Sequence, residues 1–238
     1  MPNSSPSDFE TGPPARLNRD LILKTALVQI DAVGPQRLSM RSLAQDLGVE
    51  AMSLYRYVNG REDLLEGVVG LLMGDLNANL DAELTEHWQG FMQTVAHEVR
   101  RVAVAHPRAF PLVATRHPAA PWLRPPLRSV EVVDTFLTAL IGFGFTDEQA
   151  VDAYRSFTSL LLGHLLLESA MRGADTGSVD DPLDQGDADL PEHDGKVGLT
   201  AAPQVARLRV LLSEERSDEE FEVSLEALLD RLGSHLTQ

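Results

Sequence analysis

The spacing of apolar residues is the feature that most restricts the fold of this chain. In one segment after another they recur every three to four positions, as on one face of an α-helix. No segment shows the sustained alternation of a half-buried strand, β-branched residues are sparse, and there is no internal repeat. The pattern therefore predicts an all-α protein, and 238 residues suffice for one or two domains with a substantial core.

The ends of the predicted helices follow from local signals. Gly34-Pro35 ends the first helix, because glycine tolerates the left-handed conformation and proline cannot continue the hydrogen-bond ladder. Ser39 is a predicted N-cap, and capping boxes are expected at Asn59, Thr146 and Ser217. The proline-rich stretch 107–126 predicts an irregular connection. The predicted helices span 17–33, 40–47, 51–57, 60–76, 88–103, 127–143, 147–172 and 218–235.

The composition limits the chemistry of the chain. The absence of cysteine excludes disulfides, thiolate metal sites and cysteine nucleophiles, and agrees with a cytoplasmic location. The net charge of −16 argues at first against a nucleic-acid partner. Residues 16–66, however, hold seven basic and seven acidic side chains, so the excess acid lies elsewhere. Because binding to phosphate depends on the local groups that meet it, DNA remains an eligible partner.

Two segments are expected to lie outside the packed core. Residues 1–15 have neither the basic nor the apolar part of a signal peptide, and we predict a disordered tail. Residues 173–200 are rich in acids and glycine, which predicts a flexible acidic loop. The longest apolar stretch, 160–167, is far shorter than the roughly 18 residues of a membrane span, so no membrane partner is expected.

Residues 38–58, LSMRSLAQDLGVEAMSLYRYV, have the layout of a helix-turn-helix. Gly48 supplies the turn between two short helices, Leu54 and Val58 are expected to point inward, and polar and aromatic side chains are left on the outer face. An ordinary helical hairpin has a similar apolar pattern, so spacing alone leaves both interpretations open.

From Leu17 through Leu76 the chain resembles the amino-terminal domain of the tetracycline repressor (TetR) family, through RSLAQDLGV and SLYRYVNGREDLL. The resemblance implies a DNA-binding domain over 16–62 and a homodimer that binds a near-palindromic double-stranded operator, with recognition helices in major grooves about 34–36 Å apart. The implied DNA-binding residues are Arg41, Ala51, Met52, Ser53, Tyr55, Tyr57 and Arg61. Ser39, by its chemistry, and Arg56, by its outward position, are added as candidates.

The chemistry of these side chains suggests a role for each. Arg41 can donate two hydrogen bonds to guanine, while Ala51 and Met52 can touch thymine methyl groups. Ser39, Tyr55, Tyr57 and Arg61 can hold phosphates. For Tyr55 the alternative is that its ring mainly packs within the small domain.

The resemblance continues into the effector domain of the tetracycline repressors, through EHWQGFMQTVAHEVRRVAVAHP, LVATRHP and GFGFTDEQAVDAYRSFTSLLLGHLLLE. It implies an effector-binding and dimerisation domain over 63–238. Leu112 replaces the metal-binding histidine of that family, and Glu168 lies one position from its glutamate. A magnesium–tetracycline chelate needs such ligands, so we expect a largely apolar effector, with no metal and no cofactor. The candidate ligand-binding residues are Asn77, Trp88, Phe91, Phe110, Thr115, Arg116, Trp122, Phe136, Tyr154, Phe157, His164 and Glu168.

Core packing is the alternative role for each of these aromatic side chains, and His164 can equally be an ordinary buried histidine. We expect the helices over 147–172 and 218–235 to pack against their twofold mates as a four-helix bundle.

The resulting hypothesis is a ligand-responsive repressor that controls an efflux or antibiotic-related gene. A transcriptional activator and a protein-interaction module with the same fold stay open. An enzyme is disfavoured, since the seven histidines are scattered and no H-E-x-x-H, G-x-S-x-G or phosphate-loop motif occurs.

Overall fold

The structure is a computed structural model that describes residues 17–80, 87–174 and 202–236, and every regular element in these ranges is a helix. The all-α prediction is therefore confirmed. The predicted tail over 1–15 and nearly all of the predicted acidic loop over 173–200 lie outside the described residues, as does the side chain of Asn77. Within the described ranges, no helix has the length and apolar character needed to cross a membrane.

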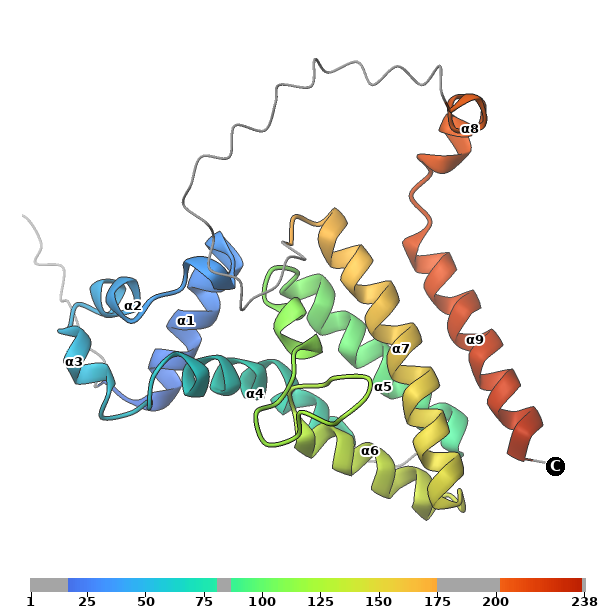
Figure 1. Cartoon of the computed structure of the whole chain (residues 1–238), viewed down its shortest axis with the longest axis horizontal. Coiled ribbons are helices and arrows are strands. Elements are labelled where there is room, and N and C mark those ends of the chain that lie inside the picture. Colours follow the sequence, from blue (N-terminus) through green and yellow to red (C-terminus); the bar gives the residue numbers. More distant parts are fainter. Residues whose placement is uncertain (1–16, 81–86, 175–201, 237–238) are drawn as a thin grey trace, which may run out of the picture.

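Three helices and a 3₁₀ turn form one end of the molecule (Figure 1): α1 (Arg19–Val33), η1 (Pro35–Arg37), α2 (Met40–Asp46) and α3 (Ala51–Leu54). As predicted, α1 ends at Gly34, which has φ of +84° and donates its N–H to the Ile30 carbonyl at 2.7 Å. Ser39 caps α2 by accepting from the N–H of Ser42, and Ser42 completes the box. Gly48, with φ of +66°, makes the turn toward α3.

The helix α4 (Arg61–Leu80) joins this end to the body, where it contacts α1 on one side and α5, α6 and η2 on the other. Its crossing with α1 is close, because a Cβ added at Gly67 would come within 2.5 Å of a Leu23 methyl carbon. Buried residues of α1 and α4 belong to the same continuous core as those of the body. Helix α4 therefore packs both with the end formed by α1 to α3 and with the body.

The body consists of α5 (Trp88–Ala105), η2 (Phe110–Ala114), α6 (Val130–Gly142) and α7 (Asp147–Met171), with α7 packed on α5 and α6. The predicted capping box at Thr146 is confirmed, since Thr146 and Gln149 exchange side-chain to backbone hydrogen bonds. The proline-rich connection is irregular as expected, except for the short 3₁₀ helix η2. Stacked rings of Phe136 and Phe157, 5.3 Å apart, join α6 to α7.

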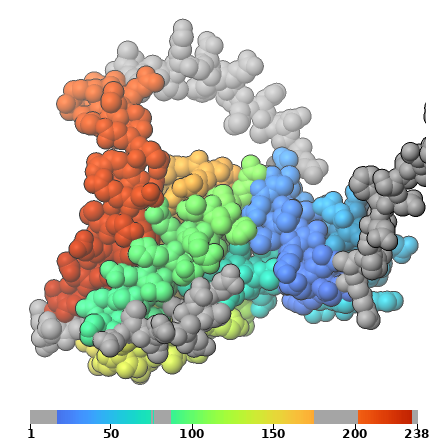
Figure 2. Space-filling view, turned by 180° about the vertical axis from the view of Figure 1, so that it is seen from behind, coloured from blue at the N-terminus to red at the C-terminus, as the bar shows by residue number. Residues whose placement is uncertain are grey.

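Two carboxy-terminal helices, α8 (Pro203–Leu212) and α9 (Ser217–Leu236), complete the described chain. Helix α9 lies along α7 and α5, whereas α8, which was not predicted, has no buried residue and stands away from the body (Figures 1 and 2). Two predicted caps differ in detail. Ser217 is the first residue of α9, and its hydroxyl donates to Glu215. The Asn59 N–H donates to Asp63 at 2.7 Å, one residue beyond the expected Glu62.

Candidate functional site

The outer face of α2 and α3 carries the candidate nucleic-acid surface. Leu54 and Val58 are fully buried and hold α3 against the small domain. Met52 is 73% exposed and Tyr55 is 47% exposed. Arg41 and Arg56 are also exposed, and neither has a hydrogen-bond or ion-pair partner in the part of the chain that the structure describes. This face therefore offers two free guanidinium groups beside an apolar and an aromatic side chain.

Other candidate DNA-binding residues are already held by contacts within the domain. Ser39 spends its hydroxyl on the α2 cap, and Arg61 donates to the Pro35 carbonyl at 3.0 Å. The carbonyl of Tyr57, whose side chain is 37% exposed, accepts from Arg19 at 2.8 Å. Ala51 and Ser53 are half-buried on α3. These contacts fix the positions from which the side chains would reach a duplex.

An ion pair between Arg19 and Asp63, with N and O 2.5 Å apart, fixes the turn between α3 and α4. The hydrogen bond from Arg19 is the main reason that the pKa of the Asp63 carboxyl lies below its usual value. The same bond raises the pKa of Arg19. Both groups are therefore charged at neutral pH. They tie to α1 the turn that follows residues 51–57, which we call the recognition segment.

A narrow, mostly apolar cavity of about 40 Å³ lies among α4, η2, α5, α6 and α7. Three of the candidate ligand-binding residues line it, namely Phe136, Tyr154 and Phe157. The Tyr154 hydroxyl donates to the Pro125 carbonyl at 3.0 Å. Burial raises the pKa of Tyr154 to about 12, so its hydroxyl is neutral. The other lining residues are Met73, Val95, Val99, Val113, Leu127, Val132, Val133, Thr158, Leu161 and Leu162.

Several other candidate ligand residues lie away from this lining. Trp122 is 74% exposed and Arg116 is also exposed. The Trp88 ring meets the Phe145 ring edge to face, with the centroids 5.5 Å apart, so it packs at the amino-terminal end of α5. Phe91 packs on Phe136 and Phe143 behind the lining, and Phe110 is fully buried in η2. Thr115 donates to the Leu112 carbonyl at 2.7 Å.

Glu168 and His164 face α9, where they belong to a cluster that we call the Arg100–Glu168 junction, formed by Arg100, His164, Glu168, Arg172, Asp218 and Phe221. Arg100 donates two hydrogen bonds to Glu168, at 3.1 and 3.0 Å. Burial raises the pKa of the Glu168 carboxyl, but hydrogen bonds from Arg100 and Arg172 outweigh it, and the resulting pKa is below the usual value. The His164 ring lies 5.4 Å from that of Phe221. These charges hold α5, α7 and α9 together.

Sequence reasoning missed most of the cavity lining. Apart from Thr158, the missed residues are aliphatic or Met, and their helical spacing is the same as that of any core position. Leu112, at the position of the family's histidine, is fully buried. Among the described residues, no group of three or more His, Asp or Glu side chains could hold a metal ion.

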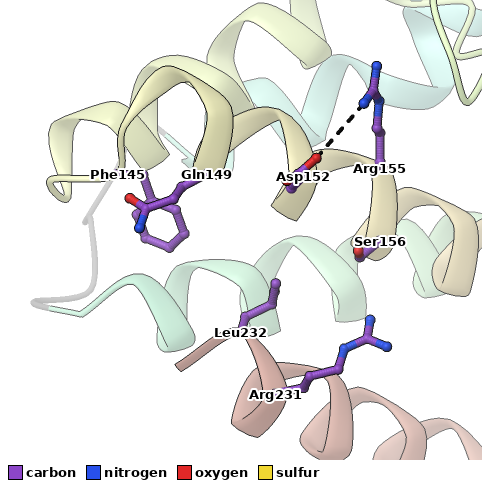
Figure 3. A pocket seen from close by; sticks show the side chains of 7 residues that line it. All are labelled: Phe145, Gln149, Asp152, Arg155, Ser156, Arg231 and Leu232. Atoms are coloured by element: carbon purple, nitrogen blue, oxygen red, sulfur yellow. Dashed lines mark ion pairs between the residues drawn. The ribbon is translucent and has the colours of Figure 1, made fainter. Parts of the chain in front are cut away.

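A separate surface groove of about 570 Å³ lies between α7 and α9 (Figure 3). Asp152 and Arg155 of α7 lie on one side of it, and Arg231 and Leu232 of α9 lie on the other. Large apolar side chains are exposed on the same two helices: Leu167 is 71% exposed, Met171 67% and Val223 60%. Both helices therefore carry uncovered apolar surface.

Comparison with known proteins agrees with this architecture. Residues 82–235 match the family model described as "Tetracyclin repressor-like, C-terminal domain". An HTH-type transcriptional regulator of Saccharopolyspora erythraea is 33% identical over 67% of this chain, which is 64% of that relative's length. The class A tetracycline repressor of Escherichia coli is 25% identical over 91% of both chains.

Solved structures extend the similarity over almost the whole fold. The TetR family protein ActR of Streptomyces coelicolor, in complex with actinorhodin, has a TM-score of 0.66 and 25% identity to this chain. The match covers 94% of this chain and all of ActR. With a helix-turn-helix end, a helical body enclosing a cavity, and a family model matching well over half its length, the chain belongs to the TetR family of transcriptional regulators.

Proposed function

We propose that this protein is a ligand-responsive transcriptional repressor, which holds a near-palindromic operator as a homodimer and releases it on binding a largely apolar small molecule. The observation that carries the proposal is the outer face of α2 and α3, where Arg41 and Arg56 are exposed without partners in the described ranges. Free guanidinium groups on a helix-turn-helix are suited to guanine edges and phosphates.

The remaining DNA contacts follow from the geometry of the same face. Met52 and Ala51 at the start of α3 offer apolar contact to thymine methyl groups, and Ser53 lies on the same helix. Tyr55, Tyr57 and Arg61 follow at the edge, where they would contact phosphates. Because Ser39 already uses its hydroxyl in the α2 cap, its contribution would be to orient Arg41.

The cavity supports a particular class of effector. Its lining is almost wholly apolar, and the hydroxyls of Tyr154 and Thr158 are the polar side-chain groups among its lining residues. A largely apolar molecule with one or two hydroxyl or carbonyl groups has the matching chemistry. At about 40 Å³ the cavity is far smaller than typical ligand pockets, which begin near 300 Å³, so binding must widen it.

Two observations concern the regulated system and the metal. The buried Leu112, whose side chain cannot ligate a metal ion, supports an effector without magnesium. Relatives that are named tetracycline repressors, after an antibiotic, support an efflux or antibiotic-related gene as the target, and the relative ActR has a solved structure in complex with actinorhodin.

The dimer is supported by the exposed apolar side chains of α7 and α9, which would be covered by the same helices of a second copy. The groove between these helices would then lie at the edge of a four-helix bundle (Figure 3).

The proposal can be tested without knowing the operator. Duplexes selected from random DNA by the purified protein should contain an inverted repeat, and footprinting should protect both half-sites. Largely apolar compounds, with actinorhodin among them, should then be screened for release of the selected duplex. Selection of no sequence, or retention of DNA by a protein that sediments as a monomer, would contradict the proposal. A reporter under the selected operator separates a repressor from an activator by the sign of its response.

A further inference from the structure

Two side chains from the segment between η2 and α6 reach the first two turns of α4. The Arg128 guanidinium donates to Glu62 at 2.7 Å, and Nε2 of His117 lies 3.1 Å from the Glu66 carboxylate. Glu62 and Glu66 are four residues apart and therefore share one face of α4. We call these two pairs the α4 clasp.

The tautomer of His117 is fixed by its second contact. The N–H of Ala119 donates to Nδ1 of His117 at 3.0 Å, so Nδ1 must be an acceptor. The proton of the neutral ring is then on Nε2, where it is donated to Glu66. The side chain of His117 is mostly buried, and both of its nitrogens are used.

On the body side, Arg128 is attached directly to the cavity wall. Its neighbour Leu127 lines the cavity, and its own N–H donates to the carbonyl of Val113, another lining residue, at 3.0 Å. Its guanidinium also donates to the Thr115 hydroxyl at 3.2 Å. A displacement of Val113 or Leu127 must therefore move Arg128.

On the other side, the clasp meets the contacts that hold the recognition segment. Asp63, the residue after Glu62, accepts from Arg19 and from the N–H of Asn59. Arg19 in turn donates to the carbonyl of Tyr57, three residues after α3. Adjacent residues in the first turn of α4 thus carry one link to the body and one to the recognition segment.

The Arg128 link is incompletely satisfied. Its side chain is 5% exposed, yet Nε is buried without a hydrogen-bond partner in the described structure. The partner carboxylate of Glu62 is 61% exposed, so water competes for it. The cost of burying a guanidinium with an unsatisfied donor offsets much of the attraction to Glu62, so this link contributes little net free energy to the present arrangement of the two elements.

We propose that Arg128 is a positioning residue that transmits the width of the cavity to the recognition helix through Glu62. The inference rests on the proposed function and adds the residue pair that would carry its regulation. An occupant larger than about 40 Å³ pushes Val113 and Leu127 outward, which withdraws Arg128 from Glu62 and frees the first turn of α4. Loss of the pair should therefore disconnect the two sites rather than abolish either one.

The test replaces the unknown effector with a bulkier cavity wall and measures affinity for the selected duplex. The full-length protein is prepared as Val133→Phe, as Arg128→Met and as the double variant. Val133→Phe should weaken DNA binding by about 10-fold, a typical allosteric coupling. In the Arg128→Met background the same change should cost less than about 2-fold, because the link is already open. Arg128→Lys, which keeps a charge for Glu62, should regain part of the response.

Arg124→Met is the matched control. Arg124 lies in the same segment and donates to the Pro121 carbonyl, and it makes no hydrogen bond or ion pair with α4 among the described residues, so its loss should leave the full response to Val133→Phe. If circular dichroism shows that Val133→Phe is unfolded, the smaller Val133→Ile takes its place.

The outcomes separate the two proposals. Equal weakening in both backgrounds, or none in the wild-type background, would overturn the role of Arg128 while DNA binding by the wild type upholds the proposed function. A wild-type protein that selects no duplex would overturn both.

Discussion

Removal of the Glu168 charge should be among the most destabilising single-atom changes in this chain. Glu168→Gln keeps the shape of the side chain but leaves the Arg100 guanidinium, 14% exposed, without its buried counter-ion. Breaking a buried ion pair from one side costs about 3–5 kcal/mol. Asp218 still contacts Arg100 at 2.5 Å and the glutamine oxygen still accepts one hydrogen bond, so we expect the lower end, about 3 kcal/mol. For a chain of this size that corresponds to a decrease in Tm of about 6–12 °C.

The assay is urea unfolding at pH 7, followed by far-UV circular dichroism at one fixed protein concentration, because association of the chain would add to the apparent stability. Asp218→Asn is the control: it removes the other acid that contacts Arg100, but that carboxylate is 92% exposed, and the cost should stay below about 1 kcal/mol. A loss under about 1 kcal/mol for Glu168→Gln, or equal losses for both variants, would refute the view that the buried pair holds α5, α7 and α9 together.

Three further predictions concern pH, packing and DNA. The pKa of Glu168 is lower in the folded state than in the unfolded chain, where it is about 4.3. The ionised carboxylate therefore adds to the free energy of unfolding above that pH, and this stabilisation is lost as the pH falls through the folded-state pKa. Acid titration should destabilise the wild type more steeply than Glu168→Gln. Gly67→Ala should cost about 1–3 kcal/mol in thermal unfolding, since its methyl would strike Leu23, whereas Gly70→Ala, with open space around it, should be neutral or stabilising. In binding assays on selected and scrambled duplexes, Arg41→Ala should lose about 1–3 kcal/mol on the selected one and relax its base preference, while Arg61→Ala should weaken both about equally; equal losses for Arg41→Ala would contradict its role as a base reader.

The helices were predictable because their signals are local. The Gly34-Pro35 stop, the Ser39 cap and the Thr146 capping box act within a few residues, and each is formed as expected. Helix α8 was not predicted, although Val205, Leu208 and Leu212 recur at helical spacing; none of its side chains is buried, so this apolar pattern adds nothing to the core. Glu62 was expected to complete the cap at Asn59, but its carboxylate accepts from Arg128 instead, a partner 66 residues away that no local pattern indicates.

The candidate site was predictable in part. The helical spacing of Leu54 and Val58, both buried, indicated which side of this segment faces outward, whereas Ala51, Met52 and Tyr55 were assigned from the family resemblance. The cavity lining was harder to predict, since aromatic side chains occur in cores, in pocket walls and in exposed loops. Phe136 lines the cavity, whereas Trp122 is exposed, and only the packing of α4 to α7 separates the two. Glu168 shows the same limit, because its counter-ion Arg100 comes from a different helix.

The close crossing of α1 and α4 at Gly67 has a practical consequence for protein engineering. Leu64, Leu65 and Val68 of α4 are fully buried in the core shared with α1, so a fragment cut at residue 62 would expose the inner side of α1 to water. Chimeras that transplant the DNA-reading end onto another effector body should therefore place the junction after Leu72 rather than at the sequence boundary. The donor's own glycine would then travel together with the leucine that it accommodates.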